Sequence, residues 1–195
     1  MPRKPRQTSS TGVYHWITRG INRKTLFHFR EDYLYFLELV RLHSKEEGVV
    51  IYHYCLMPNH VHMLVQSDDV VGLSRFSHFI KRRYAYYHSK TAKHQGASFE
   101  RMYKSLPVED DAYLLECGRY IERNPVRANL APKPDAYNYS SYSFYASGQE
   151  NAIVTPSPGY LALGNDSPAR QRLYAEYVTS LRPQDEYADP GRFGG

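Results

Sequence analysis

The chain has 195 residues, 42% of them hydrophobic, which suits one compact domain with a short appended segment rather than several domains. Its net charge of +5 allows a polyanionic partner without requiring one. No apolar run approaches the roughly 18 residues of a membrane span. Cys55 and Cys117 form neither a disulfide framework nor a CxxC spacing. We therefore expect a cytoplasmic protein with no membrane partner.

The first third of the chain predicts three strands and one helix. β-Branched and aromatic residues favour a strand over 12–21, and a helix follows over 31–48, with acidic residues at its start and a glycine at its end. Two further strands, 49–57 and 60–66, flank the Pro58-Asn59 pair. Because this pair favours a tight turn, the two strands are expected to be antiparallel neighbours.

The middle of the chain predicts two more helices. Apolar residues at spacings of three and four indicate a helix over 72–90, and three acidic residues begin another over 109–126, which we expect Pro125 to close. The segment 97–108 between them is a candidate fourth strand. These elements predict an α+β fold, with helices flanking a mainly antiparallel sheet in the ferredoxin-like manner.

The C-terminal quarter predicts one helix docked on this domain. The segment 140–148 favours a loop or a short strand, and 169–182 favours a helix. Its apolar stripe consists of Leu173, Tyr174, Tyr177, Val178 and Leu181. We expect the last residues to be frayed.

Two histidines stand one residue apart in the apolar strand at 60–66. Because side chains alternate along a strand, Val61, Met63 and Val65 are expected to face the core, and His60, His62 and Leu64 the other side. Alternate positions lie about 7 Å apart, so both imidazoles can bind one divalent ion. The alternative is a pair of partly buried histidines bonded to the backbone, and the pattern alone is a weak motif.

The helix at 109–126 offers further polar groups for such a site. Tyr120 and Asn124 are four residues apart and share one helical face, unless Pro125 turns Asn124 away. An oxygen ligand beside two imidazoles suits Mg²⁺ or Mn²⁺, which also bind phosphate oxygens. Alternatively, Tyr120 packs in the core and Asn124 only marks the end of the helix.

Three segments together resemble a known family. "MPNHVHMLV", then "CGRYIERNPVRANL" and then "DAYNYSSY" resemble, in order, the single-tyrosine transposases with a histidine-hydrophobic-histidine (HUH) signature, which are IS200-like, and most closely the REP-associated tyrosine transposases. The resemblance extends from "YHWITRGINR" to at least "YNYSSY". It implies a HUH nuclease domain over 1–147 with a basic N-terminal tail, and a C-terminal helical extension over 148–195. Departures from the family pattern are Phe99, Met102 and His88.

The resemblance implies a metal-dependent enzyme that cuts single-stranded DNA near hairpins. His60 and His62 would hold the metal ion with Asn124, and Tyr120 would be the nucleophile that forms a 5′-phosphotyrosine and later transfers the strand. The protein would act as a monomer or a homodimer. No nucleotide cofactor is expected, because the chain has no Gly-rich phosphate-binding loop.

Basic and tyrosine side chains suggest where DNA would bind. The chain has 19 Tyr and only 8 Phe, and tyrosine rings stack on unpaired bases. Tyr84, beside three cations, is also a rival nucleophile. Each cation alone is more often a solvated surface residue. The expected DNA-binding residues are Arg19, Arg23, Lys81, Arg82, Arg83, Tyr84, Arg101, Arg119, Arg123 and Arg127.

Two other function classes fit the same residues. A module that binds DNA or RNA hairpins without cutting them would use the same basic and aromatic surface, with Tyr120 in the core. A metallo-nuclease would use water in place of Tyr120. A covalent protein–DNA adduct distinguishes the transposase from both.

Overall fold

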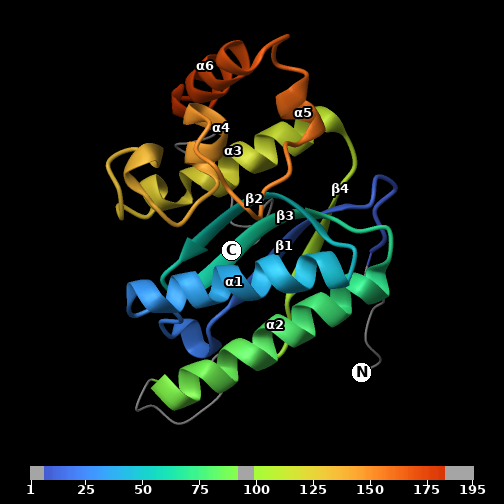
Figure 1. The fold of residues 1–195 in the computed structure, drawn as a ribbon, viewed down its shortest axis with the longest axis vertical. Helices are drawn as coiled ribbons and strands as arrows, with labels where there is room; N and C mark the ends of the chain where they lie inside the picture. The colour runs from blue at the N-terminus through green and yellow to red at the C-terminus, as the bar shows by residue number, and fades with distance from the viewer. Residues whose placement is uncertain (1–6, 92–98, 183–195) are drawn as a thin grey trace.

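The computed structural model describes residues 7–91 and 99–182 and contains a four-stranded antiparallel sheet (Figure 1). The strands lie in the order β2-β3-β1-β4, and each neighbouring pair is antiparallel. Together with two helices they follow the β-α-β-β-α-β order of ferredoxin-like folds, which confirms the predicted fold class. The strands are β1 (Val13–Arg19), β2 (Val50–Met57), β3 (His60–Gln66) and β4 (Lys104–Val108).

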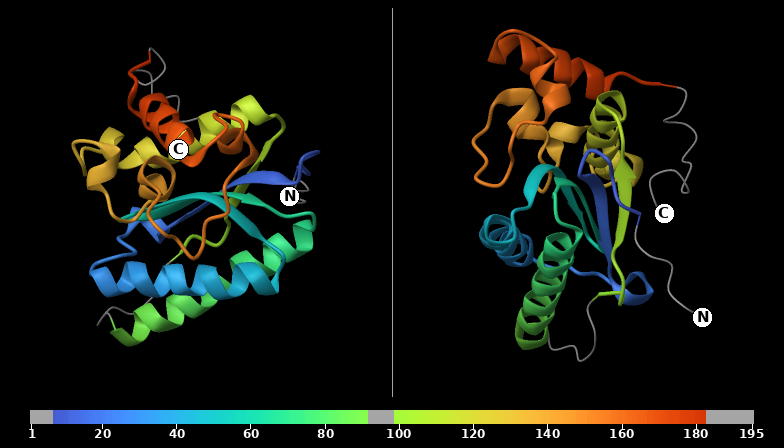
Figure 2. Two further views of the ribbon diagram at one scale, coloured as in Figure 1. Left: turned by 45° about the horizontal axis from the view of Figure 1, so that its top comes forward. Right: turned by 90° about the vertical axis from the view of Figure 1, so that its right-hand side faces the viewer.

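Helices cover both faces of this sheet (Figures 1 and 2). On one face lie α1 (Arg30–Glu46) and α2 (Val70–Thr91), and on the other lies α3 (Asp111–Arg127). Beyond α3 the chain forms an outer layer. No helix in the described ranges is long and apolar enough to cross a membrane. The remaining elements are η1 (Ile21–Arg23), η2 (Pro134–Ala136), α4 (Tyr142–Ser147), α5 (Pro158–Leu161) and α6 (Ser167–Thr179).

The alternation of side chains along the strands creates a separate core on each face. Val61, Met63 and Val65 pack with the residues of α1 and α2, whereas Leu64 belongs to the core under α3. This confirms the two faces predicted for β3. Both cysteines are free and completely buried in the core under α3.

The fourth strand is shorter than predicted. β4 begins at Lys104, and of the upstream residues Phe99 forms a single bridge to Gly20, while 97 and 98 lie outside the described residues. β4 is an edge strand, which is where sheets tolerate a proline such as Pro107.

The helix α3 continues past Pro125, so the expectation that this proline closes it is wrong. Asp110 accepts a hydrogen bond from the backbone N–H of Tyr113 and so caps the first turn, and the helix runs to Arg127. Pro125 lacks the N–H that would bond the carbonyl of Ile121. The side chain of Asn124 replaces it, since Nδ2 lies 3.3 Å from that oxygen.

The C-terminal quarter also differs from its prediction. The segment 140–148 contains the helix α4, because Tyr142 and Tyr145, three residues apart, are both buried and Gly148 ends the helix with φ of 69°. α6 ends at Thr179, and Leu181 lies outside it with 87% of its surface exposed. The division of the chain after residue 147 stays a prediction.

Close packing of α3 on β2 gives a first testable expectation. A Cβ on Gly118 would lie 2.7 Å from Nε2 of His53, which is stacked on Tyr145 and has no room to move. In an open helix, Gly→Ala stabilises by about 1 kcal/mol. Here we expect Gly118→Ala to destabilise by about 1–3 kcal/mol because of overpacking. Urea unfolding of the two proteins measures this, and a stabilised variant would contradict the packing described.

Candidate active site

The two motif histidines lie side by side at the start of β3, directly after the Pro58-Asn59 turn. Their ring centroids are 4.9 Å apart. His62 is buried, with 2% of its surface exposed, and His60 is partly exposed. The pair therefore lies between the protein interior and the solvent, and a ligand can reach it from the side of His60.

Each of these rings is held through its Nδ1 atom. Nδ1 of His60 lies 2.6 Å from Oδ1 of Asn59, and Nδ1 of His62 lies 2.9 Å from Nε2 of His15. Histidines that bind metal ions normally use one ring nitrogen for the metal and donate the other N–H to a second partner, which fixes the ring. In this arrangement Nε2 of both rings is the atom left for a metal ion.

His15 is a residue of this site that the sequence did not reveal. It lies on β1, and its ring is stacked on that of His62 with centroids 5.0 Å apart. Burial lowers the pKa of His15 to about 3, so the ring is neutral at neutral pH and can accept the proton of His62. The pairing of β1 with β3 brings the two rings together. In the sequence, only the alternation of side chains within "YHWIT" indicates which face of the strand His15 occupies.

Tyr120 reaches the histidines from the opposing helix α3. Its ring meets His62 and His15 edge-on, with centroids 5.9 Å away in each case. The guanidinium of Arg127 lies 4.9 Å from the centre of the tyrosine ring. Burial raises the pKa of Tyr120, and the positive charge of Arg127 opposes that rise.

Asn124 lies one turn after Tyr120, as the spacing predicts. Its Nδ2 donates to the carbonyl oxygen of Tyr120 at 2.9 Å, so the amide oxygen is the atom available to a metal ion. Two imidazoles and one amide oxygen fit Mn²⁺ or Mg²⁺ that shares phosphate oxygens. Within residues 7–91 and 99–182, no three His, Cys, Asp or Glu side chains form a metal site among themselves.

Three of the arginines expected to bind DNA lie around these groups. Arg19 is the cross-strand partner of His60, and its charge adds to burial in lowering the pKa of that histidine to about 4. Arg127 covers Tyr120. Arg23 is exposed, and its carbonyl accepts from Nδ2 of Asn59 at 3.3 Å. One asparagine therefore links the loop of Arg23 to His60.

Other predicted cations lie away from this face. Arg82 and Arg83 are exposed on α2, across the sheet from α3. Lys81 on the same helix donates to the carbonyls of Glu100 and Arg101, at 2.6 and 3.2 Å. The side chain of Arg101 is exposed. The structure thus divides the predicted DNA-binding residues between two faces.

Three predicted DNA-binding residues are buried in the protein, where DNA does not reach them. Tyr84 is fully buried, and its hydroxyl donates to the carbonyl of Leu26 at 2.6 Å, on the face opposite the histidines. Arg119 is 1% exposed and Arg123 is 7% exposed. Both guanidinium groups bond carbonyls at the end of α6, which the sequence could not place beside α3. The same burial removes Tyr84 as a rival nucleophile.

The buried histidines predict a loss of stability in acid. In the unfolded chain His15 titrates near 6.5, whereas in the fold its pKa is about 3. Below pH 6.5 the unfolded state therefore binds more protons, and the free energy of unfolding falls as the pH falls. For His15 we expect a loss of roughly 2 kcal/mol between pH 6.5 and 5. Urea unfolding without metal at both values tests this, and His15→Phe should reduce the difference. An equal slope in both proteins would contradict it.

Comparisons with known proteins identify the family of the chain. The model of the family described as "Transposase IS200 like" matches residues 8–124, more than half of the chain, and that range includes His60, His62, Tyr120 and Asn124. No curated protein matches the sequence. A solved REP-associated tyrosine transposase bound to a REP hairpin has the same fold, with a TM-score of 0.64 and 14% identity over 80% of this chain and 93% of the other. A putative transposase from Deinococcus radiodurans gives a TM-score of 0.44 and 21% identity over 63% of this chain and 97% of that one. The chain therefore belongs to the family of IS200-like transposases.

Proposed function

We propose that this transposase is a metal-dependent endonuclease and strand transferase that cuts single-stranded DNA near hairpins, with Tyr120 as the nucleophile. The observation that carries this proposal is the contact of Tyr120 with the histidine side of the sheet, at 5.9 Å between ring centres. A phenol can act as the nucleophile, and a divalent ion held by the two neighbouring imidazoles could polarise the phosphodiester that it attacks.

The covalent step transfers one phosphoryl group. Oη of Tyr120 forms a bond to phosphorus, the bond from phosphorus to O3′ breaks, and the 3′ oxygen takes up a proton while the phenol loses one. The product is a 5′-phosphotyrosine and a free 3′-hydroxyl. Attack by a 3′-hydroxyl reverses the step and joins the strand, so no nucleotide cofactor is consumed.

His60, His62 and the amide oxygen of Asn124 are the proposed metal ligands, with Mg²⁺ or Mn²⁺ as the ion. Bound there, the ion would offset the negative charge that develops on the phosphate oxygens. His15 and Asn59 keep the two imidazoles oriented through their Nδ1 atoms. Arg127 stabilises negative charge on the oxygen of Tyr120, both during attack and when the tyrosine leaves.

The proposed substrate is a DNA hairpin with an adjoining single strand. Its support is the fold shared with a protein solved on a REP hairpin, together with the exposed Arg23 and the partly buried Arg19 and Arg127 around the site. Arg82, Arg83 and Arg101 are proposed as further phosphate contacts outside it. Phosphate contacts of this kind supply affinity that falls steeply with salt.

The test is to mix the protein with labelled single-stranded hairpin oligonucleotides, in Mn²⁺, Mg²⁺ or EDTA, and to resolve the products on a denaturing gel. A protein-linked fragment that forms with metal and not in EDTA supports the proposal. Cutting without any adduct would favour a nuclease that uses water, and binding without cutting would favour a hairpin-binding module.

A further inference from the structure

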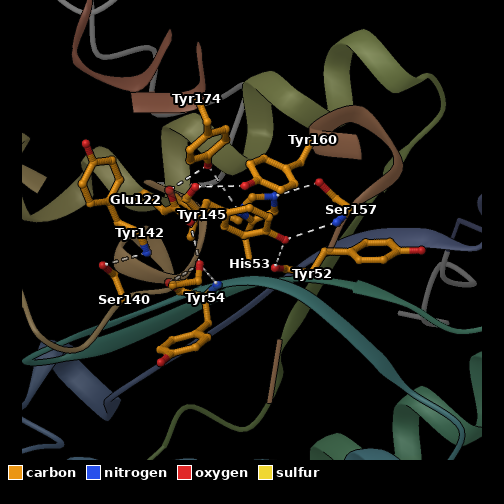
Figure 3. Close-up of polar contacts among 12 residues, drawn as sticks. Tyr52, His53, Tyr54, Glu122, Ser140, Tyr142, Tyr145, Ser157, Tyr160 and Tyr174 are labelled. Atoms are coloured by element: carbon orange, nitrogen blue, oxygen red, sulfur yellow. Dashed lines mark hydrogen bonds and ion pairs between the residues drawn. The ribbon is translucent and has the colours of Figure 1, made fainter. Parts of the chain in front are cut away.

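A fully buried carboxylate lies on α3 between the two functional residues Tyr120 and Asn124. Glu122 is 0% exposed, and it lies on the helix that packs on the sheet (Figure 3). A buried carboxylate is costly unless several donors surround it, and an apolar residue of similar size is often at least as stabilising. Its presence therefore calls for a role other than stability.

Every oxygen of Glu122 is hydrogen-bonded, and the donors come from three separate segments. Oε1 lies 3.0 Å from Nδ1 of His53 on β2 and accepts from the hydroxyl of Ser141 at 2.6 Å. Oε2 accepts from the hydroxyl of Tyr174 on α6 at 2.7 Å. Figure 3 shows His53 reaching Glu122 from the sheet below and Tyr174 reaching it from the outer helix above. We call Glu122, His53, Ser141 and Tyr174 the Glu122 cluster.

The opposite end of His53 is fixed as well. Its Nε2 lies 3.3 Å from the hydroxyl of Ser157, which precedes α5, and its ring is stacked on Tyr145 with centroids 4.3 Å apart. The chain Ser157-His53-Glu122 has the order of a hydrolase triad, but all three residues are 0% exposed, so no substrate reaches them. The arrangement is a rigid support.

The cluster lies on the flank of α3 opposite Tyr120. At 3.6 residues per turn, positions two apart point about 200° away from each other, so Glu122 and Tyr120 occupy opposite flanks of the helix. Ile121 between them packs down into the core on the sheet, and Arg123 bonds the carbonyl of Val178 on the outer side. Any rotation of α3 that breaks the contact of Glu122 with His53 turns Tyr120 by the same angle.

We propose that Glu122 is a positioning residue, which the hydroxyl of Tyr174 and the ring of His53 hold so that Tyr120 and Asn124 face the histidine pair. This rests on the proposed function of Tyr120. The C-terminal helix α6 would then help to position the active site, because the hydroxyl of Tyr174 bonds Glu122 on the helix that carries the nucleophile. The family match ends at residue 124, before α6 begins.

Tyr174→Phe is the variant that tests this, with Tyr160→Phe as its matched control. Both remove one buried hydroxyl from the same segment, but the hydroxyl of Tyr160 donates to the carbonyl of Tyr145 at 3.1 Å and does not touch Glu122. Loss of the Tyr174 hydroxyl leaves one oxygen of a buried carboxylate without its donor, so it costs more stability than loss of the hydrogen bond at Tyr160, and both variants are first shown to be folded. In folded protein, a purely structural role predicts that neither variant changes the surroundings of Tyr120.

Two measurements are compared. At saturating hairpin DNA, the single-turnover rate of adduct formation is expected to fall at least tenfold in Tyr174→Phe and less than twofold in Tyr160→Phe. In metal-free protein carrying 3-fluorotyrosine at position 120, the ¹⁹F resonance is expected to shift or broaden in Tyr174→Phe alone, since the ring moves relative to His15, His62 and Arg127.

The fluorine measurement separates this proposal from the proposed function. If no hairpin gives an adduct but the resonance still responds to Tyr174→Phe alone, the nucleophile assignment fails and the positioning role stands. If both variants leave the resonance unchanged, or change it equally, the positioning role is overturned even when the wild type forms the adduct.

Discussion

We expect Tyr120→Phe to abolish the protein–DNA adduct, while binding of the hairpin and of Mn²⁺ persists. The substitution removes only the hydroxyl, so the edge-on contacts of the ring with His62 and His15 are retained and the fold is preserved. Without an oxygen nucleophile no 5′-phosphotyrosine forms. The measurement is the labelled-hairpin gel, with a mobility-shift titration in EDTA to follow hairpin binding and a separate Mn²⁺ titration to follow binding of the ion.

Tyr84→Phe is the matched control for this result. It removes a tyrosine hydroxyl on the other side of the sheet, where the group donates to the carbonyl of Leu26. We expect it to cost about 0.5–1.5 kcal/mol of stability and to leave adduct formation intact. Loss of the adduct in Tyr84→Phe alone, or wild-type yield in Tyr120→Phe, would refute the assignment of the nucleophile.

His62→Ala is the second substitution with a large expected effect, a loss of Mn²⁺ affinity of at least a hundredfold. His62 is the more buried ligand, and its ring is fixed by Nε2 of His15, so its removal leaves His60 alone on β3. His15→Phe keeps the volume but removes the partner of Nδ1. We expect it to cost 10–100-fold in affinity, as for other second partners of metal-binding histidines.

Titration of each protein with Mn²⁺, followed by the loss of the free-ion EPR signal, measures these affinities. His78→Ala provides the control, because His78 is exposed on α2, across the sheet from the site. Circular dichroism confirms that each variant is folded. Equal affinities in His62→Ala and His78→Ala would mean that the histidine pair does not bind the ion.

The order of strands and helices follows from local patterns in the sequence. Alternation in "HVHMLVQ" assigns His60 and His62 to one face of β3, and the acidic start of α3 agrees with the cap that Asp110 provides. Where local signals are weak, the predictions fail. The segment 140–148 has no clear periodicity, and burial of Tyr142 and Tyr145 makes it helical. Pro125 predicts a helix end, but the side chain of Asn124 replaces the missing donor.

The sequence by itself determined which residues are proposed for the chemistry: two imidazoles at alternate strand positions, and a tyrosine and an asparagine one helical turn apart. These relations span two and four residues, so local geometry sets them. Only the tertiary structure decided which partners they have. His15 meets His62 across 47 residues because β1 pairs with β3, and Arg119 and Arg123 are buried because α6 docks on α3. Glutamate side chains are ordinarily exposed, but Glu122 is buried, with His53, Ser141 and Tyr174 bonded to its carboxylate. Such contacts depend on how whole elements pack, which no short segment of the chain specifies.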